Sequence, residues 1–169
     1  MSVVQKIIVM LLLKTAPQDL PYSTGLMARV IFLNLISGVI IGGADDPALA
    51  FSQMLLSVLI LLFFSYVVLS SLKLMARFVQ TVTALFGTGI IFNLLFWPIF
   101  SFSQAEQLSD FSLQVISSAI LMLVSWEILV NAHIFRNALN TKMVQAVILS
   151  MSLFFISLTL SQLILPESS

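Results

Sequence analysis

The side chains best suited to chemistry are five polar groups within or beside long apolar stretches: Glu127, Asn131, Asn34, Asn93 and His133. Asn131 follows Glu127 by one helical turn and shares its helix face. Asn34 lies about 12 Å along its own apolar stretch, a depth close to that of Glu127. A charged carboxylate at such a depth in lipid costs a few kcal/mol unless it is paired or protonated. These positions predict a buried polar cluster.

Two interpretations of this cluster stay open. The functional one is a polar site, open to the cytoplasm, that relays protons or holds a polar ligand. The structural one is hydrogen bonding between helices, worth about 1 kcal/mol per bond. The sequence favours the structural interpretation, because proton-relay chains contain several ionisable groups and only Glu127 is deep. We expect Glu127 about two turns from the end of its helix, and His133 near the mouth.

Signs of enzymatic chemistry are missing from the sequence. It contains no Cys and one His, so a catalytic metal site is not expected. Nucleotide-binding, zinc-protease and nucleophile-elbow motifs are missing as well. Lys+Arg and Asp+Glu balance at 7 each, which gives no reason to expect a nucleic-acid partner. We therefore predict a non-enzyme without catalytic residues, metal or cofactor.

The composition predicts that lipid surrounds the elements carrying these residues. Of the 169 residues, 60% are hydrophobic and 8% are charged, far below the charge of a soluble domain. A membrane span takes about 20 apolar residues. The sequence thus predicts an all-α, polytopic membrane protein, with one integral membrane domain over residues 1–169. Its five spans are expected at about 26–43, 50–72, 80–101, 112–133 and 143–165.

An amphipathic helix is expected over residues 3–13, lying in the membrane interface because it is too short to cross. Its apolar face combines Val3, Ile7 and Leu11 with Val4, Ile8 and Leu12. The breaks between spans are expected at 43–49, 73–79, 102–111 and 136–140. Trp97-Pro98 is expected to mark the end of the third span. Ser23 or Thr24 is expected to cap the first span.

The charge distribution predicts the orientation of the spans. All seven basic residues fall in or beside the segments that share a side with the N-terminus. The opposite set carries only acidic charges, at Asp45, Asp46, Glu106, Asp110 and Glu167. Because basic loops stay cytoplasmic, the N-terminus is expected inside and the C-terminus outside. The compact chain with short loops favours a bacterial inner membrane.

Small residues in two spans predict close helix packing. Gly38 and Gly42 form a G-x-x-x-G pattern in the first span, and Thr83, Gly87 and Gly89 follow in the third. The contact is expected to be internal, although a partner helix would use the same faces.

Residues 76–87, ARFVQTVTALFG, and the later Trp97-Pro98 pair resemble the Yip1-like family of small polytopic membrane proteins. The resemblance implies a five-span layout and a non-enzymatic membrane scaffold or adaptor. The leading functional hypothesis is accordingly a small subunit or assembly factor that packs against another integral membrane protein or a second copy of itself. The alternative is a small transporter or permease component in which Glu127 is the coupling carboxylate.

Overall fold

The computed structural model describes residues 1–42, 46–103 and 109–165, and every regular element in those ranges is helical. This confirms the all-α prediction, with five long helices and one short N-terminal helix. The elements are α1 (Val3–Leu11), η1 (Pro17–Asp19), α2 (Thr24–Gly42), α3 (Pro47–Ser71), η2 (Met75–Arg77), α4 (Phe78–Ser103), α5 (Asp110–Leu139) and α6 (Met143–Ile164).

Five helices are long and apolar enough to cross a membrane, with mean hydropathies of 1.7 to 2.4. Large apolar side chains are exposed along all of them, among them Phe32, Phe63, Leu94, Met122 and Leu163. Such a surface suits lipid as the surrounding solvent. The chain therefore has the architecture of a multi-pass integral membrane protein.

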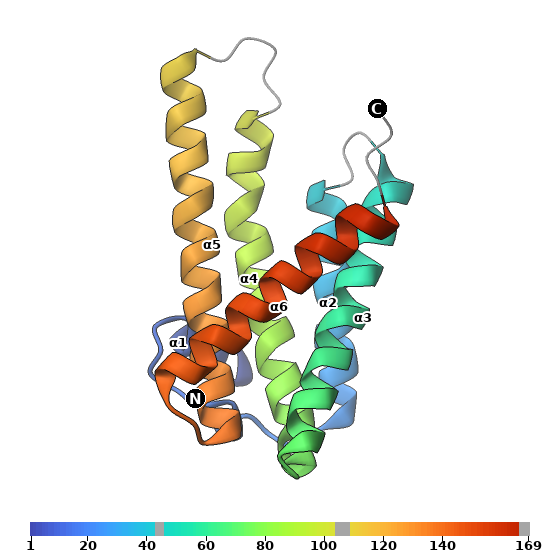
Figure 1. The fold of residues 1–169 in the computed structure, drawn as a ribbon, viewed down its shortest axis with the longest axis vertical. Helices are drawn as coiled ribbons and strands as arrows, with labels where there is room; N and C mark the ends of the chain where they lie inside the picture. Colours follow the sequence, from blue (N-terminus) through green and yellow to red (C-terminus); the bar gives the residue numbers. More distant parts are fainter. Residues whose placement is uncertain (43–45, 104–108, 166–169) are drawn as a thin grey trace.

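The helices form a bundle in which α4 is central. It packs along α2 on one side and α5 on the other, while α3 packs on α2. Helix α6 runs obliquely across the bundle from α5 to α3 (Figure 1). Residues of this crossing helix and of the other four long helices line one cavity, which is the candidate site.

Two expected helix ends are wrong. Helix α4 continues through Pro98 to Ser103, so Trp97-Pro98 does not end the span. Proline is tolerated within membrane helices because neighbouring groups can satisfy the freed backbone. Helix α5 also continues through Arg136 to Leu139, and it ends where Asn140 adopts a left-handed conformation with φ 54°. The turn before α6 is therefore shorter than the expected 136–140 break.

Other boundaries shift by a few residues. Helix α3 begins at Pro47, three residues early, because Asp46 Oδ1 accepts hydrogen bonds from the N–H groups of Ala48 and Leu49, both at 3.0 Å. Ser23 Oγ accepts from the N–H of Leu26 at 3.2 Å, as expected of a cap for α2. Gly43, Asp45, Glu106 and Glu167 of the predicted turns and tail lie outside the described residues.

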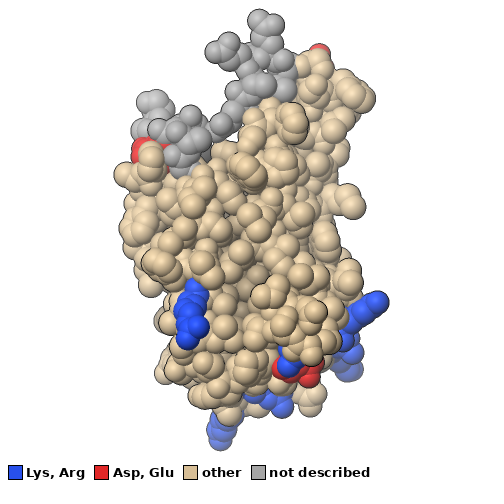
Figure 2. All heavy atoms as spheres, turned by 180° about the vertical axis from the view of Figure 1, so that it is seen from behind, with Lys and Arg blue, Asp and Glu red and all other residues tan. Residues whose placement is uncertain are grey.

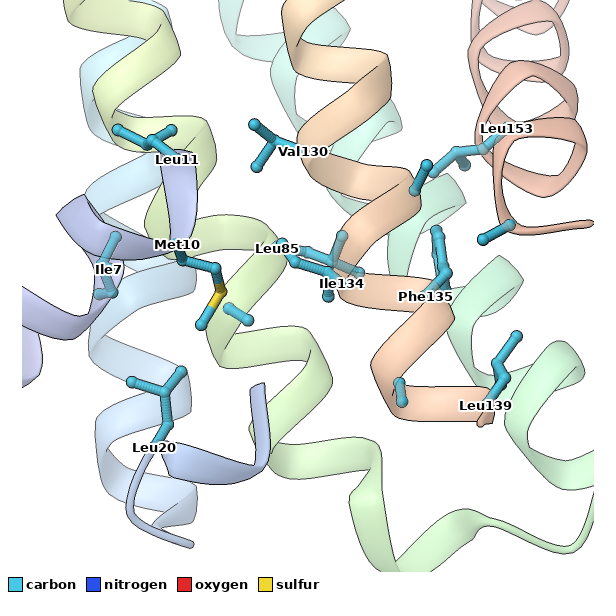
Figure 3. Close-up of a cluster of buried hydrophobic side chains, with 14 of the residues drawn as sticks. Ile7, Met10, Leu11, Leu20, Leu85, Val130, Ile134, Phe135, Leu139 and Leu153 are labelled. Atoms are coloured by element: carbon cyan, nitrogen blue, oxygen red, sulfur yellow. The ribbon is translucent and has the colours of Figure 1, made fainter. Parts of the chain in front are cut away.

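The N-terminal helix ends at Leu11 rather than residue 13, and only part of its predicted apolar face packs inward. Ile7, Met10 and Leu11 are buried, whereas Val4, Ile8 and Leu12 are exposed. Figure 3 shows the buried three directed into the same cluster as side chains of α4 and α5. Helix α1 is thus held between the bundle and its surroundings.

Charges separate along the bundle. Lys and Arg side chains gather toward one end, while acidic side chains are visible near the other (Figure 2). Asp46 and Asp110 stand at the starts of α3 and α5, at the end opposite Arg77 and Lys142, which precede α4 and α6. Asp19 is an acidic residue at the basic end, where its backbone carbonyl accepts a hydrogen bond from Lys6 Nζ.

Candidate functional site

A cavity of about 260 Å³ lies inside the bundle and is lined by α2, α3, α4, α5 and α6. Most of its polar lining comes from residues that are far apart in the sequence. They are Asn34 from α2, Ser57 from α3, Asn93 from α4, Glu127 and Asn131 from α5, and Ser150 and Ser157 from α6. Four of the five residues expected to form a polar cluster therefore border one space.

Helix α5 presents Glu127 and Asn131 to the cavity because residues four apart share a helix face. The expected depth of Glu127 is wrong. Since α5 runs on to Leu139, Glu127 lies twelve residues, or about 18 Å, from that helix end rather than two turns. The carboxyl group is therefore placed well within the bundle.

Hydrogen bonds hold Asn34 and Asn93 at the boundary of α2 and α4. Asn34 Nδ2 donates to the carbonyl of Phe86 at 3.4 Å. Asn93 Nδ2 donates to Ser37 Oγ at 2.9 Å and to the backbone carbonyl of Asn34 at 3.3 Å. Asn34 is 7% exposed and lies directly over Gly89, where an added Cβ would come within 2.6 Å of Asn34 Nδ2. The missing side chain of Gly89 makes room for this asparagine.

Ser150 is a cavity residue that the sequence did not single out. Its side chain is 3% exposed, and its hydroxyl has no hydrogen-bond partner among the described residues. A buried hydroxyl without a partner is unfavourable by about 1–3 kcal/mol, which a bound water or solute would relieve. Serines are common in membrane helices as packing residues, so sequence alone gave no signal to separate Ser150, Ser57 or Ser157 from the others.

His133 does not join the cavity. Its Nε2 donates to the carbonyl of Thr15 at 2.9 Å, and Asn137 Nδ2 donates to the backbone carbonyl of His133 at 2.7 Å. The ring is buried rather than placed at a mouth, because the segment after α1 covers it. Trp126 lies on the same side of α5, and its Nε1 donates to the carbonyl of Leu11 at 3.1 Å.

Further hydrogen bonds fasten the N-terminal segment to the bundle. Gln80 Nε2 donates to the carbonyls of Leu20 and Gln18 at 2.6 and 3.1 Å, and Gln18 Nε2 donates to the carbonyl of Asn137 at 2.6 Å. At the same end of the bundle, Arg77 Nη1 donates to the carbonyl of Ala138 at 2.8 Å and joins η2 to the end of α5. Residues 1–20 therefore form a strap across α4 and α5, on the side of α5 away from Glu127.

Three of the small residues make contacts within the chain. Gly38 lies against the side chain of Met54, Gly89 lies against Asn34, and a Cβ added to Gly87 would come within 2.8 Å of Ile7. Among the described residues, nothing lies within 4 Å of a Cβ added to Gly42. Thr83 is buried, and its hydroxyl donates to the carbonyl of Val79 at 2.7 Å within α4.

The cavity combines one carboxyl group with neutral polar groups and apolar walls. No Lys, Arg or His is among the described residues that line it. Such a lining can accept hydrogen bonds from a small solute and can hold a proton or positive charge at Glu127. No family model, curated protein or solved structure matches the chain. The Yip1-like resemblance accordingly stays a prediction.

Proposed function

We propose that this chain is a small transporter or permease component that binds a small polar solute in its central cavity, with Glu127 as the coupling carboxylate. The supporting observation is that Glu127, Asn131, Asn34 and Asn93 border one space together with an unpartnered serine hydroxyl. Asn34 and Asn93 also make hydrogen bonds between α2 and α4, as purely structural groups would, but within the described part of the chain the side chains of Glu127 and Asn131 make none. Ionisable residues inside membrane bundles mark substrate and ion pathways in other membrane proteins.

The size of the cavity supports the same proposal. An apolar cavity of about 150 Å³ binds benzene in another protein, so about 260 Å³ accommodates a somewhat larger molecule or several waters. Pockets for drug-sized ligands begin at about 300 Å³. The solute is therefore small, and its polar groups find partners on all five long helices.

The alternative proposal is a scaffold or adaptor that packs against another membrane protein or a second copy. It depends on small-residue faces being free for a partner. Gly38, Gly87 and Gly89 contact residues of this chain, and Gly42 is the glycine of this set that has no described residue within 4 Å of an added Cβ. The solute-binding proposal is therefore the better supported of the two.

The orientation is proposed as an N-terminus in the cytoplasm and a C-terminus outside, in a bacterial inner membrane. Its support is the gathering of Lys and Arg at one end of the bundle (Figure 2). In this orientation the strap formed by residues 1–20 faces the cytoplasm.

Cysteine accessibility tests the proposed function, and the natural absence of Cys makes the background clean. Ser150→Cys places a thiol on the cavity wall, whereas Ser65→Cys is a matched control on α3. Ser65 is 0% exposed and its hydroxyl also has no hydrogen-bond partner among the described residues, but it is not one of the cavity-lining residues. Both variants are treated with iodoacetamide, a small neutral reagent, in native membranes.

We expect Ser150→Cys to be alkylated and Ser65→Cys to stay unmodified, as measured by intact-protein mass spectrometry. If neither thiol were alkylated, small solutes could not reach the cavity, and the proposal would fail. Equal reactivity would contradict it too, because the labelling would then report general loosening of the bundle.

A further inference from the structure

We infer that the solute is a small organic cation carrying N–H donors, of the primary ammonium class, held by Glu127, Ser150 and the side-chain oxygens of Asn34 and Asn93. This inference rests on the proposed function and names the substrate class of that site. It follows from polar atoms of Glu127, Ser150, Asn34 and Asn93 that no hydrogen bond within the described part of the chain uses.

The asparagines offer acceptors to the cavity. The Nδ2 groups of Asn34 and Asn93 are engaged by the carbonyl of Phe86 and by Ser37 Oγ. Within the part of the chain that the structure describes, no hydrogen bond is made to Oδ1 of either residue, and an amide oxygen is only an acceptor. The amide oxygens therefore remain to accept a donor from the solute.

Glu127 adds acceptor capacity, since an ionised carboxylate offers two oxygens and no donor. Ser150 contributes a hydroxyl that has no partner within the described part of the chain. With no basic side chain on the described lining, an anionic solute would have no countercharge, whereas a cation would neutralise Glu127. A primary ammonium carries three donors on one centre, which suits a lining that offers several acceptors.

The apolar walls indicate an organic cation rather than a metal ion. Leu85, Phe86 and Phe154 stand among the lining residues, and aromatic faces attract cations. Ca²⁺ takes six to eight oxygen ligands, commonly from several carboxylates, while this lining contains a single one. In an organic ammonium ion, the ammonium group would contact the polar acceptors and the apolar part of the molecule would contact the apolar walls.

Charge-selective labelling gives the first test. Ser150→Cys is treated at pH 8 with two methanethiosulfonate reagents of similar size, one carrying a trimethylammonium group and the other a sulfonate. We expect Glu127→Gln to lower the ratio of the two labelling rates, cation over anion, at least tenfold. Asp110→Asn is the matched control, because Asp110 is an exposed carboxylate in the first turn of α5, and it should leave the ratio unchanged. A ratio insensitive to Glu127→Gln would overturn the inference.

Ligand protection gives the second test, with the chain in nanodiscs of neutral lipid. Benzylammonium, benzyl alcohol and benzoate share one ring and differ in charge, and each is tested for slowing iodoacetamide labelling of Ser150→Cys. We expect protection by benzylammonium that weakens at least tenfold in Glu127→Gln, with little protection by the other two. Protection by benzyl alcohol or benzoate alone would overturn the cation class while leaving a solute-binding cavity in place. Protection by none would overturn the cation inference, whereas the proposed function is decided separately by the labelling of Ser150→Cys against Ser65→Cys.

Discussion

Gly89→Ala should destabilise the protein because α4 has no room for a side chain where Asn34 crosses it. The added Cβ would lie 2.6 Å from Asn34 Nδ2, well inside an ordinary contact distance, so the asparagine must move. Overpacking of this kind typically costs about 1–3 kcal/mol. The displaced Nδ2 also loses its bond to the Phe86 carbonyl, worth about 0.6 kcal/mol between membrane helices. The higher helix propensity of alanine offsets this loss of stability by up to about 1 kcal/mol. With the full gain in helix propensity, the expected net loss is about 0.6–2.6 kcal/mol.

The assay is unfolding of the purified protein by sodium dodecyl sulfate titrated into mixed micelles, followed by far-ultraviolet circular dichroism. Gly42→Ala is the matched control, since it makes the same change in α2 at a position where no described residue lies within 4 Å of the new Cβ. It should leave the free energy of unfolding unchanged or raise it by up to about 1 kcal/mol. If the two variants agreed within about 0.5 kcal/mol, the close approach of Asn34 to α4 would be refuted.

Two further predictions concern the strap and the start of α3. Trp126→Phe removes the donor to the Leu11 carbonyl and should speed amide hydrogen exchange in residues 1–20. Trp126→Tyr keeps a donor and should speed this exchange less. Equal exchange rates in both variants and the unmodified protein would show that the Trp126 bond does not hold the strap in place. Asp46→Ala should lower the free energy of unfolding by about 0.5–2 kcal/mol through loss of the helix cap, measured by the same detergent titration. Asp46→Ser should retain most of the capping stabilisation, because serine is also a good N-cap residue. Equal losses of unfolding free energy in Asp46→Ala and Asp46→Ser would argue against a capping role for Asp46.

The number and nature of the long helices could be predicted from the sequence because hydropathy is a property summed over some twenty residues. The ends of α4 and α5 could not. Pro98 and Arg136 are ordinary signals of a helix end in water. In α4 the bundle accommodates the proline, and α5 continues past Arg136 until Asn140 reverses the chain. Local sequence signals of this kind do not determine where a helix ends when packing with neighbouring helices stabilises its continuation.

Distance along each helix was enough to expect Asn34 at a level close to Glu127, and both border the cavity, although Glu127 lies farther from its helix end than expected. The unpartnered hydroxyl of Ser150 could not be expected, since it depends on the oblique course of α6 across the bundle (Figure 1). The strap was missed for a similar reason. Its bonds from Gln80, Trp126 and His133 end on backbone carbonyls of the N-terminal segment, and a carbonyl acceptor has no sequence signature.

The separation of His133 from Glu127 follows from helix geometry. At about 100° per residue, Trp126, His133 and Asn137 fall within about 40° of one another around α5, and this face lies about 120° from the face of Glu127 and Asn131. One face holds the N-terminal strap through Leu11 and Thr15, while the other borders the cavity. Because Trp126 and Glu127 are consecutive, the contact that fixes the indole also fixes the rotation of α5 about its axis at that level. The strap therefore helps to set the direction in which the carboxyl group points, although no residue of the strap lines the cavity.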